Sequence, residues 1–298
     1  MPLPALLLLA LSLVSCAREN APARIDPTLV SLLPPDTYTL VGGRIDQLQQ
    51  APAYQKYVSS FTTQVDEFVK RTGLDPRKDL GEFLVSSNGK ETVLLVKGRF
   101  EVAAIEKQLA SVGQARDVGG RRVWSTGDQS LCFANSSIAI VARDAQVEGV
   151  LKQVGRTVKL DAHLAGPLEK IPSAAPLWGV VTGGIPPFEV SENSNLANLS
   201  KVIASVRTLV AWSDFSNGFK LTVTGTCQDE AGAKTLHSGI RGLIGIGRLT
   251  TPQDQPELLR VFDALITKQD GAVVEFTADL SMQQLESLQS VTGRLGRR

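Results

Sequence analysis

Residues 83–98, FLVSSNGKETVLLVKG, consist of two apolar runs on either side of Asn88-Gly89. An Asn-Gly pair between apolar runs predicts a β-hairpin with a tight turn, because both residues tolerate a positive φ angle. The same pattern returns at residues 208–225, TLVAWSDFSNGFKLTVTG, around Asn217-Gly218. Apolar and polar residues alternate in the second half of this segment, which is typical of a strand with one buried face. The sequence therefore predicts two antiparallel hairpins.

Helices and single strands surround both hairpins in the same order. Residues 37–45, TYTLVGGRI, resemble a strand before the first hairpin, and residues 177–185, LWGVVTGGI, resemble one before the second. In each half a strand, a helix, a hairpin, a helix, a strand and a helix follow one another, although the spacings differ by about ten residues. This order predicts an α+β fold of two loosely duplicated ferredoxin-like units, with antiparallel sheets and helices packed on one face. The pattern leaves open whether the two sheets join edge to edge.

The helices are predicted from apolar residues spaced three and four apart. This spacing runs from Tyr54 to Val69 and again from Asp229 to Gly247. Near the C-terminus, Ser281 and Gln284 have the spacing of a capping box, in which each side chain bonds the backbone of the other. That pair predicts the start of a last helix.

Composition divides the chain into six parts. These are a signal peptide at 1–16, a flexible Pro-containing tether at 17–36, a first α+β repeat at 37–155, a connection at 156–176, a second α+β repeat at 177–293 and a basic tail at 294–298. The tether and the connection are assigned because each contains several prolines. Arg294, Arg297 and Arg298 in the tail are expected to be solvated, with contact to anionic lipid or glycan as the alternative.

The N-terminal segment is almost wholly apolar from Leu3 to Val14 and ends in Leu-Val-Ser-Cys at residues 13–16. A run of this length is too short to span a bilayer and is typical of a secretory signal. Its ending resembles the lipobox of bacterial lipoproteins. The first four residues carry no Lys or Arg, which departs from the usual signal and leaves open a start further upstream. An unprocessed, buried N-terminal helix with an incidental cysteine is the alternative.

The lipobox resemblance implies that Cys16 is lipidated, becomes the first residue of the mature chain and anchors the protein to a lipid bilayer. It also implies a place in the bacterial cell envelope, facing the periplasm or the cell surface. Ala17 stands where many proteins retained at the inner membrane have Asp, so the resemblance points to the outer membrane.

Overall composition is that of a folded globular protein, with 43% apolar and 20% charged residues. The 31 basic and 30 acidic residues nearly balance. Nucleic-acid binding requires a basic surplus on one face, so no nucleic-acid partner is expected.

Two cysteines remain if Cys16 is lipidated. Cys132 and Cys227 lie in strand-like runs, and the oxidising envelope would permit a disulfide between them. The alternative is that both are small buried apolar residues, which is common for a lone cysteine in a strand.

No catalytic or metal-binding pattern stands out. The two histidines are His163, which follows Asp161 in the connection, and His237, which lies in an expected helix. Asp-x-His could transfer protons, but a solvated surface pair is the simpler interpretation. The sequence contains no Gly-x-Ser-x-Gly elbow, and no cluster has metal-ligand spacing, so no cofactor is expected. The glycines at 239, 242, 245 and 247 match no phosphate loop and predict a smooth helix face that another element can approach closely.

A candidate ligand surface lies near the start of the second repeat. Aromatic and proline residues near strand ends can form a stacking surface for a sugar or a peptide; here they are Trp178, Pro186, Pro187, Phe188 and Trp212. The alternative places both tryptophans in the core.

Together these features predict a non-enzymatic, membrane-anchored envelope lipoprotein that acts as a binding or scaffold module, with an envelope protein or glycan as partner. One rival is an envelope-acting hydrolase of glycan or peptide, which a concave pocket with two carboxylates about 5–9 Å apart would favour. Another is a periplasmic carrier of an apolar ligand, which would require a large internal cavity.

Overall fold

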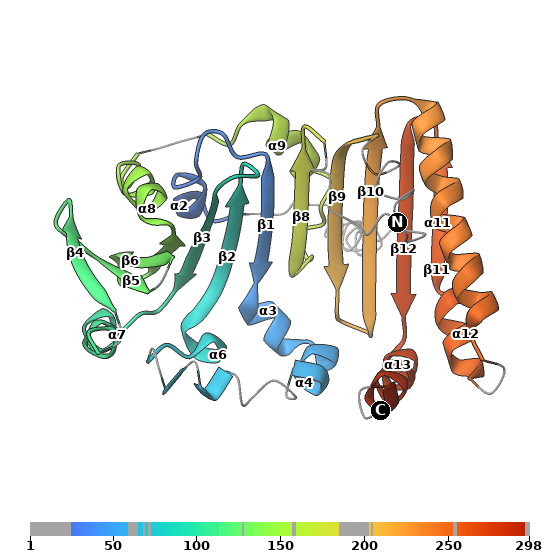
Figure 1. Ribbon diagram of the computed structural model, residues 1–298, viewed down its shortest axis with the longest axis horizontal. Coiled ribbons are helices and arrows are strands. Elements are labelled where there is room, and N and C mark those ends of the chain that lie inside the picture. The colour runs from blue at the N-terminus through green and yellow to red at the C-terminus, as the bar shows by residue number, and fades with distance from the viewer. Residues whose placement is uncertain are drawn as a thin grey trace, which may run out of the picture.

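The computed structural model describes residues 25–295, except 59–64, 68, 71–72, 112, 127, 157–158, 185–202, 204 and 253–254. One antiparallel sheet of twelve strands forms its centre, in the order β11-β12-β10-β9-β8-β1-β2-β3-β7-β6-β5-β4 (Figure 1). The strands are β1 Thr39–Arg44, β2 Leu80–Ser87, β3 Thr92–Gly98, β4 Gln114–Val118, β5 Arg121–Thr126, β6 Gln129–Asn135, β7 Ile138–Ala142, β8 Leu177–Thr182, β9 Val206–Asp214, β10 Phe219–Cys227, β11 Leu265–Asp270 and β12 Val273–Leu280.

Both predicted hairpins are confirmed. β2 pairs with β3 across Asn88-Gly89, and β9 pairs with β10 across Asn217-Gly218. Gly89 has φ +80° and Gly218 has φ +120°, so both turns use the left-handed region that favours glycine.

The α+β class is confirmed, and the two halves join edge to edge through β1 and β8. A duplicated ferredoxin-like arrangement is not confirmed. β1 pairs directly with β2, and β8 pairs directly with β9, whereas a split β-α-β unit has another strand between these two.

Ten helices accompany the described sheet. They are α2 Pro27–Val30, α3 Ile45–Gln50, α4 Pro52–Val58, α6 Pro76–Asp79, α7 Val102–Leu109, α8 Asp144–Leu151, α9 Ala162–Leu168, α11 Glu230–Thr250, α12 Pro256–Asp263 and α13 Met282–Leu295. The capping box before α13 is confirmed: the backbone N–H of Ser281 donates to Gln284 Oε1 at 2.9 Å, and that of Gln284 donates to Ser281 Oγ at 3.3 Å.

Helices cover both faces of the sheet, so the expectation of a single covered face is wrong. On one face, α2, α8 and α9 pack against Leu84, Leu95 and Ile140. On the opposite face, α7 packs against Val96, and α11 packs against Val274 at the far end of the sheet (Figure 1). The central strands are apolar at consecutive positions, and side chains alternate between faces, so both faces need cover.

The folded part begins before the residue at which the tether was expected to end. Leu29, Leu32 and Leu33 are 0%, 2% and 6% exposed and belong to the largest core cluster. Asp26 caps α2 by accepting the N–H of Thr28 at 2.8 Å. The flexible tether therefore cannot extend through residues 26–33, because the core already contains their leucines.

The expected connection at 156–176 also contributes to the core. It contains α9, whose Leu164 and Leu168 are buried in the same cluster as the α2 leucines. Among the described helices, none is both long enough and apolar enough to cross a membrane.

Candidate functional site

Four of the residues singled out from the sequence lie outside the described part of the chain. They are Cys16, Pro186, Pro187 and Phe188. The structure therefore places only the two tryptophans of the expected ligand surface.

Trp178 on β8 and Trp212 on β9 are directly opposite each other. Trp178 is only 6% exposed, and its indole ring covers the backbone of Gly42 on β1, where a Cβ would overlap the ring. Trp212 is half-buried against the same core cluster. Trp178 is thus a core residue at the joint between the two halves, as the alternative interpretation of the sequence has it, and it offers no ligand surface there.

The disulfide that the sequence left open is absent, and the alternative of two small buried residues holds. Cys132 on β6 and Cys227 on β10 are both free and buried. Six strands lie between β6 and β10 in the sheet, so the two are seven spacings apart, or roughly 34 Å at about 4.8 Å per spacing. A disulfide requires Cα atoms within about 7 Å, so no local adjustment could join these two cysteines.

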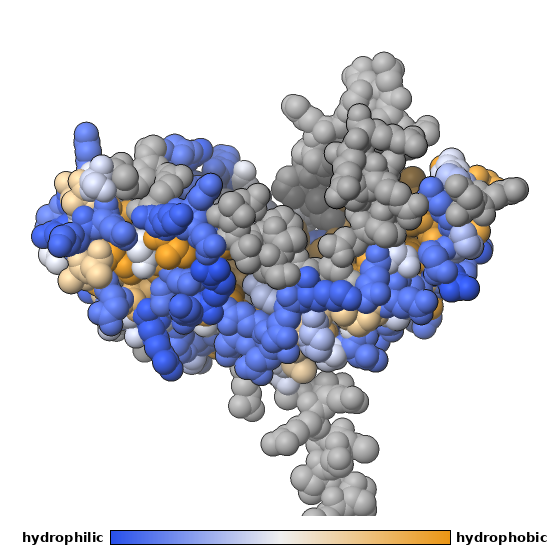
Figure 2. All heavy atoms as spheres, turned by 90° about the horizontal axis from the view of Figure 1, so that it is seen from below, coloured by the Kyte–Doolittle hydropathy of each residue, from blue (hydrophilic) through white to orange (hydrophobic). Residues whose placement is uncertain are grey.

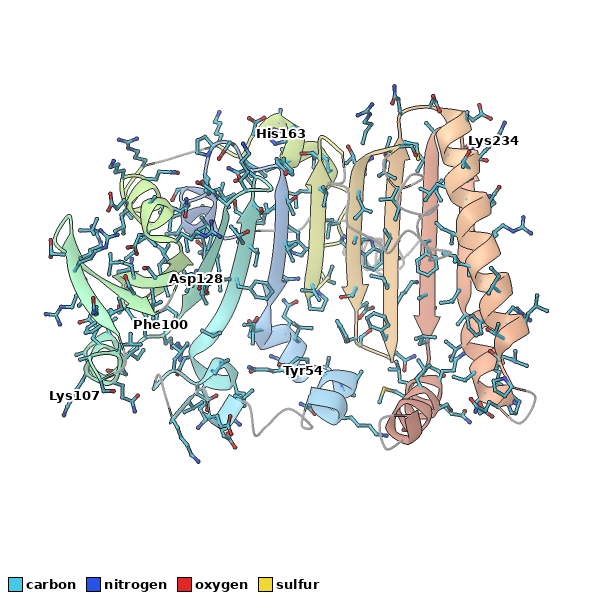
Figure 3. The ribbon with its side chains drawn as sticks, in the orientation of Figure 1. Tyr54, Phe100, Lys107, Asp128, His163 and Lys234 are labelled. Atoms are coloured by element: carbon cyan, nitrogen blue, oxygen red, sulfur yellow. The ribbon has the colours of Figure 1, made fainter. Side chains whose placement is uncertain are left out.

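The Asp161–His163 pair exists, but it serves the fold. His163 Nδ1 lies 2.8 Å from Asp161 Oδ1, and Nε2 lies 2.9 Å from the carbonyl oxygen of Thr37. The hydrogen bonds that His163 donates to the Asp161 carboxylate and to the carbonyl of Thr37 raise the pKa of His163. Both ring nitrogens are therefore engaged in joining α9 to the start of β1, at the upper edge of the sheet in Figure 3.

The glycine run is divided between two roles. A Cβ added at Gly247 would overlap the ring of Phe262 on α12, which confirms the close approach of another element predicted for this glycine. A Cβ at Gly239, Gly242 or Gly245 would meet nothing within 4 Å among the described residues.

The strongest candidate site is a charged cleft of about 480 Å³ at the end of β1, β2 and β3, beside α3 and α6. Its four cations are Arg44, Lys78, Lys97 and Arg99, and its three carboxylates are Asp46, Asp79 and Glu82. Figure 2 looks onto this edge of the sheet and shows a mostly hydrophilic surface. In the described part of the chain, no group of His, Cys, Asp or Glu could hold a metal ion.

Strand register aligns three of these charges in a row. Arg44 on β1 is directly opposite Glu82 on β2, and Glu82 is directly opposite Lys97 on β3. Such neighbours have Cβ atoms about 5 Å apart. Lys97 forms an ion pair with Asp26, and the backbone N–H of Asp26 donates to Glu82 Oε1 at 3.3 Å. The N-terminal segment is therefore fastened to one wall of the cleft.

The two carboxyls at this wall have pKa values shifted in opposite directions. Burial raises the pKa of Glu82, and the negative charge of Asp26 adds to the effect. Burial also opposes ionisation of Asp26, but the hydrogen bonds from Lys97 and from the N–H of Thr28 outweigh it and lower the pKa of Asp26. The arrangement favours the ionised form of Asp26, whereas the positive charges of Lys97 and Arg44 only partly offset the effect of burial on Glu82.

The cleft was not predicted from the sequence. Its residues come from segments that are far apart in the sequence, and only the pairing of β1, β2 and β3 brings them together. A partial signal was present, since Arg44, Glu82 and Lys97 are the charged residues in or at the ends of otherwise apolar strand segments.

Comparison with known proteins gives a likeness of fold only. No protein-family model and no curated protein sequence matches the chain. Crystal form I of TP0453 is similar with a TM-score of 0.50 and 10% sequence identity, over 90% of this chain and 98% of that one. Crystal forms III and IV of TP0453 give TM-scores of 0.49 and 0.48, also at 10% identity and over 90% of this chain, with 99% and 97% of those chains covered.

Proposed function

We propose that the protein is a non-enzymatic bacterial envelope lipoprotein, anchored to a bilayer by lipidated Cys16, that acts as a binding or scaffold module. The leader and the Leu-Val-Ser-Cys ending support the anchor. Ala17 favours the outer membrane, with the folded part facing the periplasm or the cell surface. The partner is an envelope protein or glycan, and the balanced charge of the chain argues against nucleic acid.

The observation that carries this proposal is the attachment of the N-terminal segment to the charged cleft. Ile25 packs against the main core cluster, and Asp26 contacts both Glu82 and Lys97. Only residues 17–24 then separate the anchor from the folded part. So short a linker between the lipid anchor and the folded part holds the cleft near the membrane, where envelope ligands are encountered.

Metabolic labelling tests the anchor. Cells expressing the chain are fed a palmitate analogue, and the wild type is compared with Cys16→Ala. Label on the wild type that disappears in the variant is the expected result. Equal label on both, or none on either, would refute the assignment of Cys16.

A hydrolase is the second candidate, and one observation favours it. Glu82 and Asp26 are neighbouring carboxyls with pKa values shifted apart, which is the pattern of an acid and a base in glycoside hydrolysis. Glu82→Gln would abolish any release of soluble fragments from purified cell-wall glycan if Glu82 were the acid. The carrier alternative has less support, because the cleft of about 480 Å³ is lined mainly by charged side chains, which do not suit an apolar ligand.

The two halves of the sheet support a loose duplication as a further part of the proposal. β1, β2, β3 and β7 follow one another outward from the joint, and β8, β9, β10 and β12 do the same on the other side. Each half places its Asn-Gly hairpin second and third in this order. Descent from one α+β unit would explain both the repeated element order and the edge-to-edge joint.

A further inference from the structure

Two of the four cations of the charged cleft, Arg44 and Arg99, have no carboxylate partner among the described residues, and a third, Lys78, has only a distant one. Within the described chain, Arg44 donates from its guanidinium to the carbonyl oxygens of Ser173 and Ala175, and no carboxylate lies within 4 Å of it. Arg99 is exposed and has no ion pair among the described residues. Lys78 is 80% exposed and 3.9 Å from Asp75, which already binds Arg77.

Among the described residues, the three carboxylates of the cleft accept hydrogen bonds from backbone N–H groups alone. Glu82 accepts a backbone N–H from Asp26, and Asp79 Oδ2 accepts one from Asp75 at 2.7 Å. Asp46 accepts only the N–H of Gln47 at 2.9 Å. None of these three forms an ion pair with another described residue.

Charges of both signs thus line one hollow, and none of its three carboxylates forms an ion pair within 4 Å with one of its described cations. The hollow has the volume of a small-molecule site, which is typically about 300–1,000 Å³. Backbone hydrogen bonds and strand register hold Arg44, Glu82 and Asp79 in place, so these groups need little reordering to meet a ligand. A ligand with only one charge would leave the opposite set uncompensated, whereas a zwitterion would satisfy both.

We propose that this cleft binds a phosphoethanolamine group, with the phosphate on Arg99, Lys78 and Arg44 and the primary ammonium on Glu82 and Asp46. A phosphate suits the cationic side because it can accept several charge-assisted hydrogen bonds at once. A primary ammonium suits the carboxylate side because it has three donors. The place of the cleft near the membrane rests on the proposed function, and it makes a phospholipid headgroup one source of the group. A free phosphoethanolamine compound is the other source.

Isothermal titration of the full chain, purified in a maltoside detergent, tests the proposal. The probes are O-phosphoethanolamine, inorganic phosphate, ethanolamine and phosphocholine. Saturable binding of O-phosphoethanolamine, tighter than that of each fragment and of phosphocholine, is the expected result. Inorganic phosphate that binds as tightly would overturn the proposal, as would the absence of saturable binding.

Matched variants separate the cleft from general surface charge. Arg99→Ala and Asp46→Asn are each expected to weaken binding about tenfold, the loss of one charge-assisted contact. Lys107→Ala on α7 (labelled in Figure 3) removes one exposed charge outside the cleft, and Asp270→Asn on β11 removes another; both are expected to leave binding unchanged. Equal losses in all four variants, with unfolding midpoints unchanged, would refute the assigned site.

A short-chain phosphatidylethanolamine, used below its micelle concentration, distinguishes the two sources. Binding about tenfold tighter than O-phosphoethanolamine would identify a lipid headgroup, and equal binding would identify a soluble compound. These titrations do not depend on Cys16. Loss of the palmitate label with binding retained would therefore refute the anchor alone, and label retained without binding would refute the cleft alone.

Discussion

Leu29→Ala tests whether the N-terminal segment is part of the fold. Leu29 is completely buried, in a core cluster that also contains Leu32 and Leu33 of the same segment. The helix that holds Leu29 has only four residues, and so short a helix is not stable by itself in water. Its position therefore depends on the buried leucines and on the cap from Asp26.

The expected cost follows from the burial. A fully buried Leu→Ala change removes about 3–4 kcal/mol, combining lost transfer free energy with the cavity that remains. At an m-value of about 3 kcal/mol/M, this lowers the urea midpoint by about 1 M. The measurement is urea unfolding, followed by far-UV circular dichroism, of a chain of residues 17–298, which contains every described residue.

Leu249→Ala is the matched control. It makes the same chemical change at a position on α11 that is 88% exposed, and such surface changes shift stability by at most about 0.5 kcal/mol. A chain that starts at residue 37 is expected to lose its cooperative transition, whereas one that starts at residue 25 is expected to keep it. Equal midpoints for Leu29→Ala and Leu249→Ala would refute the docked segment and restore a tether that ends at residue 36.

Three further predictions concern the joint, the cysteines and the cleft. Gly42→Ala is expected to lower the free energy of unfolding by about 1–3 kcal/mol, because the added Cβ would overlap the Trp178 ring. The double variant Gly42→Ala with Trp178→Val should recover part of this loss in the same urea assay. Burial raises the pKa of Cys132 to about 11, so this thiol is expected to resist iodoacetamide at pH 8 in the native chain and to react in urea, as mass spectrometry would show. The pKa of Asp26 is lowered in the folded state, so its stabilising contribution is present above its unfolded value near 3.8 and is lost as pH falls below it. Lys97→Met is therefore expected to reduce the urea midpoint at pH 7 and to approach the wild type below about pH 4; a difference that does not depend on pH would contradict this coupling.

The local elements were predictable because their causes are local. Asn-Gly turns, alternating strands and the Ser281–Gln284 capping box each need only a few neighbouring residues, and the structure confirms them. The segment before residue 37 contained comparable signals that its prolines obscured. Asp26 and Pro27 suit an N-cap and a first helical position, and Leu29, Leu32 and Leu33 have helical spacing.

Long-range features could not be obtained in the same way. Whether β1 joins β8 depends on the fit of Gly42 beneath Trp178, which are 136 positions apart and carry no mark of the pairing in the sequence. The cleft depends on the register of three strands and on the place where Asp26 docks. The oxidising envelope and the presence of two remaining cysteines permitted a disulfide, and only the strand order shows how far apart these cysteines lie.

The length of the segment between Cys16 and Asp26 limits how the sheet can be oriented on the membrane. From Cys16 to Asp26 the chain can extend at most about 35 Å, at up to 3.6 Å per residue. Twelve strands at about 4.8 Å span roughly 53 Å from β4 to β11, and Asp26 is fastened to β2 and β3, well inside that span. Strand β11 lies seven spacings from β3, or about 34 Å, which is nearly the maximum extension of the segment from Cys16 to Asp26. If Cys16 carries the lipid, a sheet that stood upright on its β11 edge would therefore extend this segment almost fully, whereas a sheet that lies flat on the bilayer or meets it with the cleft would not.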